Sequence, residues 1–159
     1  MTQTERRPAY DFDFFTGTWQ VRHRRLSSPL DSTSDWIEFE GITNAHTHHG
    51  GAIHVDEVSL AEPGHYGFTI RTYDQERKDW TIHWVNNRVG RLEPPVRGRF
   101  TDGVGTFYGT DEVDGRPVRV RFVWSEISDT TARWRQAFSV DGGTTWVDNW
   151  EMRFTREAK

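Results

Sequence analysis

The chain has 159 residues, a net charge of -4 at pH 7 and no cysteine, which excludes disulfides, thiolate metal sites and a cysteine nucleophile. The length favours one domain over residues 1–159, large enough to bury a core. The acidic balance without any basic run argues against nucleic-acid binding, and no apolar run approaches the roughly 20 residues of a membrane helix.

The N-terminal residues 1–9 are polar and hold no apolar segment. We therefore expect a flexible N-terminus, no secretory signal and a cytoplasmic location. Residues 8–15 allow one short helical turn before the first strand. Gly17 and Trp19 then open that strand. We expect Trp19 to plug one end of a barrel, with Gly17 letting the entering chain pass close to it.

Turn signals such as Asp-Gly and Gly-Gly pairs recur after residue 26 every 8 to 14 residues or so, which is the spacing of an antiparallel meander. Large rings suit short strands, and the chain holds eight Trp, ten Phe and four Tyr. The pattern predicts an all-β fold, a single closed antiparallel up-and-down barrel of about nine or ten strands. Arginines scattered along the strands, Arg71 among them, are interpreted as solvated strand faces paired with acids.

Turn chemistry predicts the register of two hairpins in the middle of the chain. A two-residue turn at Asp114-Gly115 places Phe107 opposite Phe122. The turn at 74–78 predicts one inward face for the flanking strands, carrying Phe68, Ile70, Trp80, Ile82 and Trp84. Arg71 and His83 then point outward.

The last hairpin carries the pattern S-x-D-x-G-x-T-W over residues 139–146, the Asp-box of sialidase-like propellers. The box occurs once here, whereas propellers repeat it, so we interpret it as a hairpin stabiliser. Pairing Ser139 with Thr145 sets Gln136 opposite Asp148 on the inward face. That face also carries Trp134 and Trp150.

Two ends of the chain suggest a family. Residues 11–19 (DFDFFTGTW) and 36–41 (WIEFEG) form one part, and residues 134–146 with 149–154 (NWEMRF) form the other. Together with R-x-Y-D at 71–74 and W-x-x-x-W at 80–84, they resemble a bacterial family of uncharacterised lipocalin-like (calycin-like) proteins close to domain of unknown function 1579. The resemblance implies a lipocalin-like barrel in which Arg153 or Arg156 stacks on Trp19.

The predicted cavity has flat apolar walls and one polar point. The residues expected to bind a ligand are Trp84, Trp124, Trp134, Gln136, Asp148 and Trp150. Gln136 and Asp148 would orient a polar group of a small, largely apolar, aromatic or polycyclic molecule. Alternatively, these two residues satisfy each other or a buried water, or cap indole N–H groups.

The histidines offer weaker alternatives, and the main expectation is that no cofactor is bound. His46, His48 and His54 cluster near a turn and have the donor type for zinc, or they form a hydrated loop. A haem would need an interior histidine, and only His23 or His54 is placed to enter the barrel.

Three function classes stay open at this point. The first is a binding protein for a small apolar molecule. The second is an enzyme in the same cavity, a cyclase or isomerase using Asp148 or His54 as acid or base, or His54 paired with Asp56, or a metal enzyme at the histidine cluster. The third is a barrel packed solid by its own rings, acting only through homodimer contact.

Overall fold

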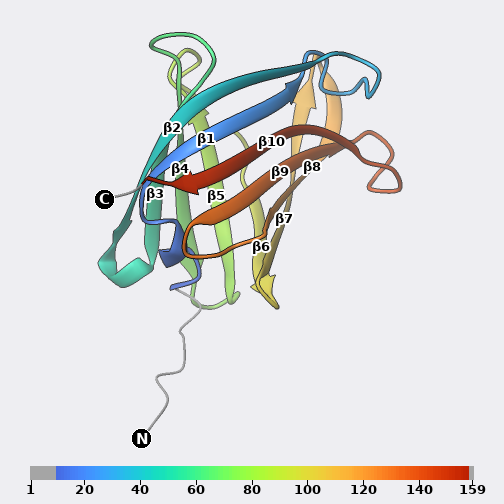
Figure 1. The fold of residues 1–159 in the computed structure, drawn as a ribbon. Coiled ribbons are helices and arrows are strands. Elements are labelled where there is room, and N and C mark those ends of the chain that lie inside the picture. Colours follow the sequence, from blue (N-terminus) through green and yellow to red (C-terminus); the bar gives the residue numbers. More distant parts are fainter. Residues whose placement is uncertain (1–9, 158–159) are drawn as a thin grey trace, which may run out of the picture.

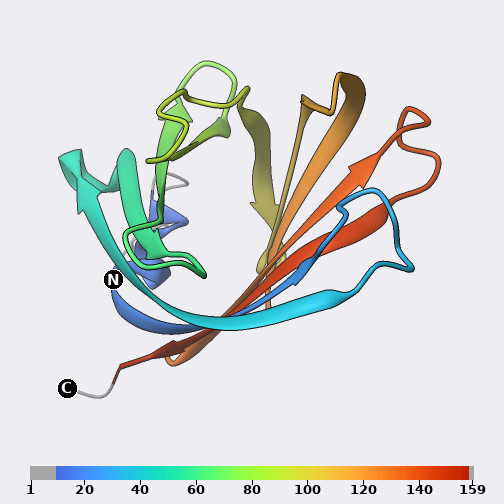
Figure 2. The ribbon, with the colours of Figure 1, turned by 90° about the horizontal axis from the view of Figure 1, so that it is seen from above.

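The computed structural model describes residues 10–157, so the predicted flexibility of residues 1–9 lies outside the described part. Its strands are β1 (Gly17–Leu26), β2 (Trp36–His48), β3 (Ile53–Ser59), β4 (Tyr66–Asp74), β5 (Asp79–Asn86), β6 (Val96–Thr101), β7 (Val104–Val113), β8 (Arg116–Ser125), β9 (Thr131–Ser139) and β10 (Val147–Arg156). Each strand pairs antiparallel with the next, and β1 pairs with β10 (Figures 1 and 2). The predicted all-β, closed up-and-down barrel is confirmed.

Within residues 11–157, helix is confined to two short 3-10 turns, η2 (Asp13–Phe15) and η3 (His49–Gly51). The predicted turn before the first strand corresponds to η2. Within residues 10–157, no helix has the length and apolarity to cross a bilayer.

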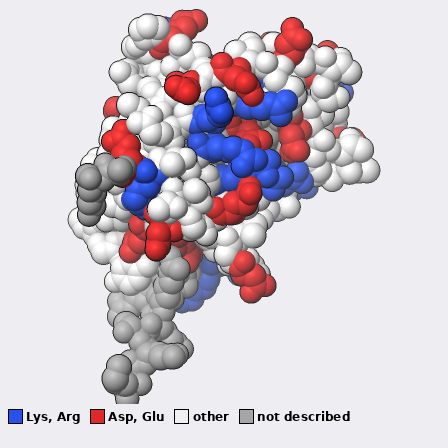
Figure 3. Space-filling model, in the orientation of Figure 1, with Lys and Arg blue, Asp and Glu red and all other residues white. Residues whose placement is uncertain are grey.

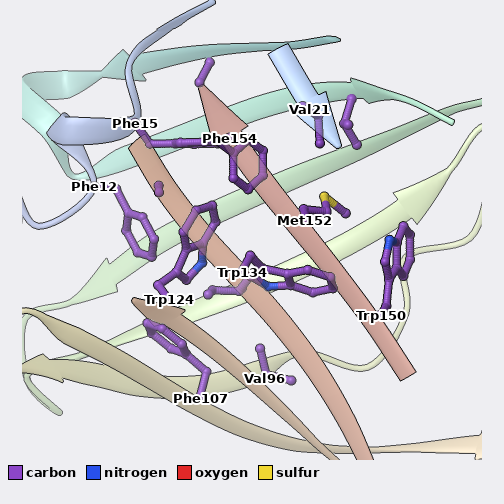
Figure 4. Packing of buried hydrophobic residues seen from close by; sticks show 14 of the residues in the cluster. Phe12, Phe15, Val21, Val96, Phe107, Trp124, Trp134, Trp150, Met152 and Phe154 are labelled. Carbon is purple, nitrogen blue, oxygen red and sulfur yellow. The ribbon is translucent and has the colours of Figure 1, made fainter. Parts of the chain in front are cut away.

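The end of the barrel beside η2 is closed by aromatic rings. Trp19 is fully buried, and its indole N–H donates to the Phe15 carbonyl at 2.9 Å. Phe15 packs edge-on against Trp124 and Phe154, with ring centroids 4.8 Å away in both cases. Figure 4 shows Phe12, Phe15 and Trp124 gathered at this end of the core. The predicted plug is confirmed.

An arginine on the last strand locks the plug. The Arg156 guanidinium lies 4.1 Å over the Trp19 ring and donates to the carbonyls of Phe14, Thr16 and Asp129 at 2.5, 2.6 and 2.8 Å. Of the two arginines that the resemblance offered for this stack, Arg156 is therefore the one that stacks. Gly17 has a φ of +121° and leaves room for the guanidinium.

The predicted register is right for one of the two central hairpins and wrong for the other. Phe107 lies opposite Phe122 as predicted. The prediction for β4 is wrong, because Arg71 lies opposite Ile82 and faces inward, whereas Phe68 and Ile70 face outward. The loop between Asp74 and Asp79 contains four residues, which brings the even-numbered residues of β4 to the outer surface.

The Asp-box stabilises its hairpin as predicted. The Asp141 carboxylate accepts from the Thr145 amide at 2.9 Å and from both the Ser139 and Thr145 hydroxyls. The predicted register is wrong, because Val147 lies opposite Phe138 and the ladder shifts between Asp148 and Trp150. This β-bulge leaves Asn149 as an extra residue.

The outer surface of β1, β8, β9 and β10 carries many arginines, with acids among them (Figure 3). Glu151 pairs with Arg133 at 3.1 Å and with Arg153 at 2.6 Å, and Arg24 lies 3.8 Å from Glu38. The charged side chains of this outer surface are therefore solvated and paired. Arg71 is the exception, because it is buried inside the barrel.

The barrel wall is weakest between β5 and β6, which share only three residue pairs in the described ladder. Val96 begins β6 opposite Ile82, so β5 beyond Ile82 has no strand partner on that side in the described part of the chain. The segment between β5 and β6 folds back along β5, where the Glu93 amide donates to the Trp84 carbonyl at 2.8 Å. The barrel therefore widens at the end opposite Trp19.

Candidate functional site

A cavity of about 410 Å³ lies inside the barrel. This volume is within the range of small-molecule sites. Eight aromatic rings from four strands and the N-terminal segment line it: Phe15, Trp84, Phe122, Trp124, Trp134, Phe138, Trp150 and Phe154. The aromatic residues therefore do not fill the barrel completely.

Five of the six residues predicted to bind a ligand line this cavity: Trp84, Trp124, Trp134, Gln136 and Trp150. Asp148 does not, and its expected inward position is wrong. Its exposed carboxylate lies 3.7 Å from Arg121 on the outer surface. The bulge is the cause, because one extra residue turns the side chain before it to the opposite face.

Asn149 takes the inward place that was predicted for Asp148. It is 1 % exposed and lines the cavity. Gln136 Nε2 donates to its Oδ1 at 2.9 Å, and Asn149 Nδ2 donates to the Pro29 carbonyl at 3.3 Å. The polar point is thus an uncharged pair of amides, and no sequence signal identifies the bulge that creates it.

Three of the tryptophans contact one another edge to face. Trp150 meets Trp84 at 90° and Trp134 at 87°, with centroids 5.8 and 5.5 Å apart. Such edge-to-face contacts fix ring orientation. Trp84 lies flush against Gly67, where a Cβ would fall 1.7 Å from the indole. The walls are therefore flat and held in place before any ligand enters.

A buried ion pair forms the inner end of the cavity, a feature that the sequence prediction missed. Arg71 is 3 % exposed and Asp56 is 5 % exposed, and both line the cavity. Arg71 Nη2 lies 2.6 Å from Asp56 Oδ1, and Nη1 lies 3.0 Å from His54 Nδ1. Burial raises the pKa of Asp56, and the charge of Arg71 opposes that shift. The pair compensates its own charge.

Burial keeps both interior histidines uncharged. It lowers the pKa of His54 to about 2, with a further contribution from Arg71, and it lowers the pKa of His23 to about 4. Since Arg71 donates to Nδ1 of His54, the ring proton is on Nε2. Likewise, Trp150 donates to Nδ1 of His23 at 3.2 Å.

The structure does not bring together the three histidines of the alternative zinc site. His46 and His48 are exposed on the outer surface of β2, whereas His54 faces the interior of β3. Residues 10–157 contain no group of three potential ligands close enough to hold a metal ion. His23 and His54 enter the barrel, as expected, but neither lines the cavity, so neither is placed to be the axial ligand of a haem held there. His54 and Asp56 are both buried, but Arg71 bridges them.

The mouth of the cavity is acidic. Four carboxylates line it: Glu93, from the segment between β5 and β6, and Asp111, Glu112 and Asp114, from the end of β7 and the turn after it. Burial, followed by the neighbouring Asp111, raises the pKa of Glu93, while Arg25 opposes the shift. Arg25 lies 4.3 Å over the Trp150 ring. Negative charge at the rim therefore outweighs positive charge.

Comparison with known proteins supports the fold. No family model and no curated protein matches the chain. Among solved structures, an S-type phycobiliprotein lyase from Guillardia theta superposes with a TM-score of 0.60 at 10 % identity, covering 99 % of each chain. A redesigned β-barrel superposes with a TM-score of 0.50 at 11 % identity, covering 98 % of this chain and all of that one. At this identity the similarity shows the barrel fold alone.

Proposed function

We propose that this chain is a lipocalin-like binding protein that holds one small, largely apolar, aromatic molecule inside its barrel. The cavity of about 410 Å³ between Trp84, Trp124, Trp134 and Trp150 carries this proposal. Flat indole walls bury the faces of an aromatic molecule, and a few convergent polar groups orient it. The plug at Trp19 leaves the acidic end as its entrance.

The contacts inside the cavity favour binding over acid–base catalysis. Gln136 and Asn149 are hydrogen-bonded to each other, and Asp56 forms an ion pair with Arg71. A general acid or base needs an available proton or lone pair near the operating pH. Among the inward groups, His54 stays neutral and its Nδ1 is occupied.

A fluorescence titration with N-phenyl-1-naphthylamine tests the proposal. This uncharged aromatic probe brightens in apolar surroundings, and we expect saturable, one-to-one binding by the native chain. In Val58→Phe a ring replaces a small side chain in the cavity wall, so affinity should fall at least tenfold. Val123→Phe adds the same ring on the outer surface of β8 and should leave affinity unchanged.

Native mass spectrometry of protein purified from its host provides a second measurement. A reproducible mass above that of the denatured chain would identify the natural ligand. If the native chain shows neither saturable probe binding nor any added mass, the binding function is contradicted, and the packed barrel that acts through homodimer contact takes its place. The predicted homodimer and the cytoplasmic location stay predictions.

A further inference from the structure

One carboxylate near the mouth is aimed into the cavity. Phe107 on β7 is fully buried, and the ladder with β8 runs without a break from Phe107 to Asp111, so both side chains face inward. Asp111 lies opposite Val118, which is buried as well. Asp111 itself is only half-buried and lines the cavity, so a molecule held there can reach its carboxylate.

The chain supplies no counter-charge for this carboxylate. Within residues 10–157 Asp111 forms no ion pair, and its Oδ1 accepts a hydrogen bond from the neighbouring Glu112 amide at 2.8 Å. The charge on which Asp111 acts is another carboxylate, because its repulsion is, after burial, the next cause of the raised pKa of Glu93. A positive charge held at the mouth would relieve this repulsion.

The other charges that line the cavity leave it negative. Arg71 and Asp56 compensate each other as an ion pair at the inner end. One arginine, Arg25, then stands against the four carboxylates of the mouth. A concave site with an excess of one charge sign raises the local concentration of ligands of the opposite sign. Since residues 10–157 hold no group of three ligands for a metal ion, an organic cation fits these carboxylates better.

The tryptophan walls add a second attraction for a cation. An indole face attracts a positive charge that lies within about 6 Å of the ring centre. The Arg25 guanidinium already makes such a contact, 4.3 Å over the Trp150 ring. Trp84 reaches the acidic end too, because its carbonyl accepts from the Glu93 amide at 2.8 Å. Rings and carboxylates therefore meet at the same end of the cavity.

We propose that the cavity binds an aromatic cation, a ring system that carries a protonated amine or a quaternary ammonium group, with Asp111 as the counter-charge. The rings of the ligand pack on the tryptophan walls, and the cation stays at the mouth beside Asp111. This inference rests on the proposed binding function and adds to it a ligand class and a residue that determines specificity.

Two probes of the same shape test the charge. 1-Naphthylmethylamine is protonated at neutral pH, whereas 1-naphthylmethanol has a hydroxyl in place of the ammonium group and no charge. Each is titrated against the full chain loaded with N-phenyl-1-naphthylamine. At about 0.01 M salt the amine should bind about tenfold or more tightly than the alcohol. This preference should shrink at about 1 M salt, where the Debye length falls to about 3 Å.

Asp111→Asn assigns the preference to its residue, because it keeps the shape of the side chain and removes the charge. The amine should then bind about as tightly as the alcohol, while unchanged affinities for the alcohol and the uncharged dye show that the cavity is intact. The matched control, Asp102→Asn, removes the same charge from the turn at the other end of β7. Asparagine tolerates the φ of +52° at that position, and this variant should keep the preference.

The outcomes separate the cation site from the container. If the native chain binds the dye but binds the amine no more tightly than the alcohol, the cation site is overturned and cavity binding stands. A preference that persists unchanged in Asp111→Asn, or that disappears equally in Asp102→Asn, would overturn the role of Asp111. If neither the dye nor either probe binds, both the cation site and the proposed function fail.

Discussion

Removing the charge of Arg156 should weaken the whole barrel, because this side chain ties the plug to the last strand. In Arg156→Met the aliphatic stem is largely kept, while the guanidinium is lost. Three backbone carbonyls, those of Phe14, Thr16 and Asp129, then lose their donor, and Trp19 loses the cation above its ring.

The size of the effect follows from these contacts. A hydrogen bond to a charged group contributes about 1.5–3 kcal/mol when shielded. Arg156 is half-buried, so water replaces part of each bond, and we take about 1 kcal/mol for each of the three. The expected loss in the free energy of unfolding is about 3 kcal/mol, which corresponds to a fall in Tm of roughly 6–12 °C for a chain of this length.

Urea denaturation followed by tryptophan emission measures this loss. The matched control is Arg153→Met, three residues earlier on β10, where an exposed guanidinium contacts Glu151 on the outer surface. That change should cost under about 1 kcal/mol. If Arg156→Met is no more destabilising than Arg153→Met, the arginine lock does not hold the plug and the reasoning is refuted.

Three further changes have equally direct expectations. Gly67→Ala drives a methyl group into the Trp84 indole, so probe affinity and thermal stability should both fall in titration and calorimetry. As pH falls from 6.5 toward 4, unfolded chains protonate histidines that the folded chain keeps neutral. The free energy of unfolding should therefore drop, by up to about 2.7 kcal/mol per pH unit for the two buried rings, and the urea midpoint should drop with it; an unchanged midpoint would contradict their burial. Asn149→Ala should cost about 1–3 kcal/mol in a denaturation curve and Asp148→Ala almost nothing, and the reverse order would argue against the bulge.

The sequence was sufficient for the architecture because its signals are local. Gly17, Trp19 and the turn pairs each act within a few residues, and they correctly predicted the plug and the closed meander. Strand alternation then identified the four tryptophans and Gln136, because large rings on an alternating strand mark the inner face.

Two errors in the predicted site have the same physical origin. Each strand has only two faces, so a register wrong by one residue reverses every assignment along it. Phe68 looks like a core residue and Arg71 like a surface residue, but the four-residue loop after Asp74 sets the opposite register, and the buried Arg71 then pairs with Asp56 on β3. The bulge at Asn149 likewise arises from the meeting of two strands, which no single segment encodes.

In a regular ladder the pairing of two strands also determines which side chains point inward. The bulge in β10 separates these two properties. Asp148 pairs with Ala137 and Trp150 with Gln136, so the residues on either side of Asn149 face consecutive positions of β9 as though nothing lay between them. The amide that reaches into the cavity is therefore supplied by a residue that the ladder does not require. Through insertion or deletion of a single codon at this place, the interior of the barrel could gain or lose a polar group during evolution while all ten strands keep their partners.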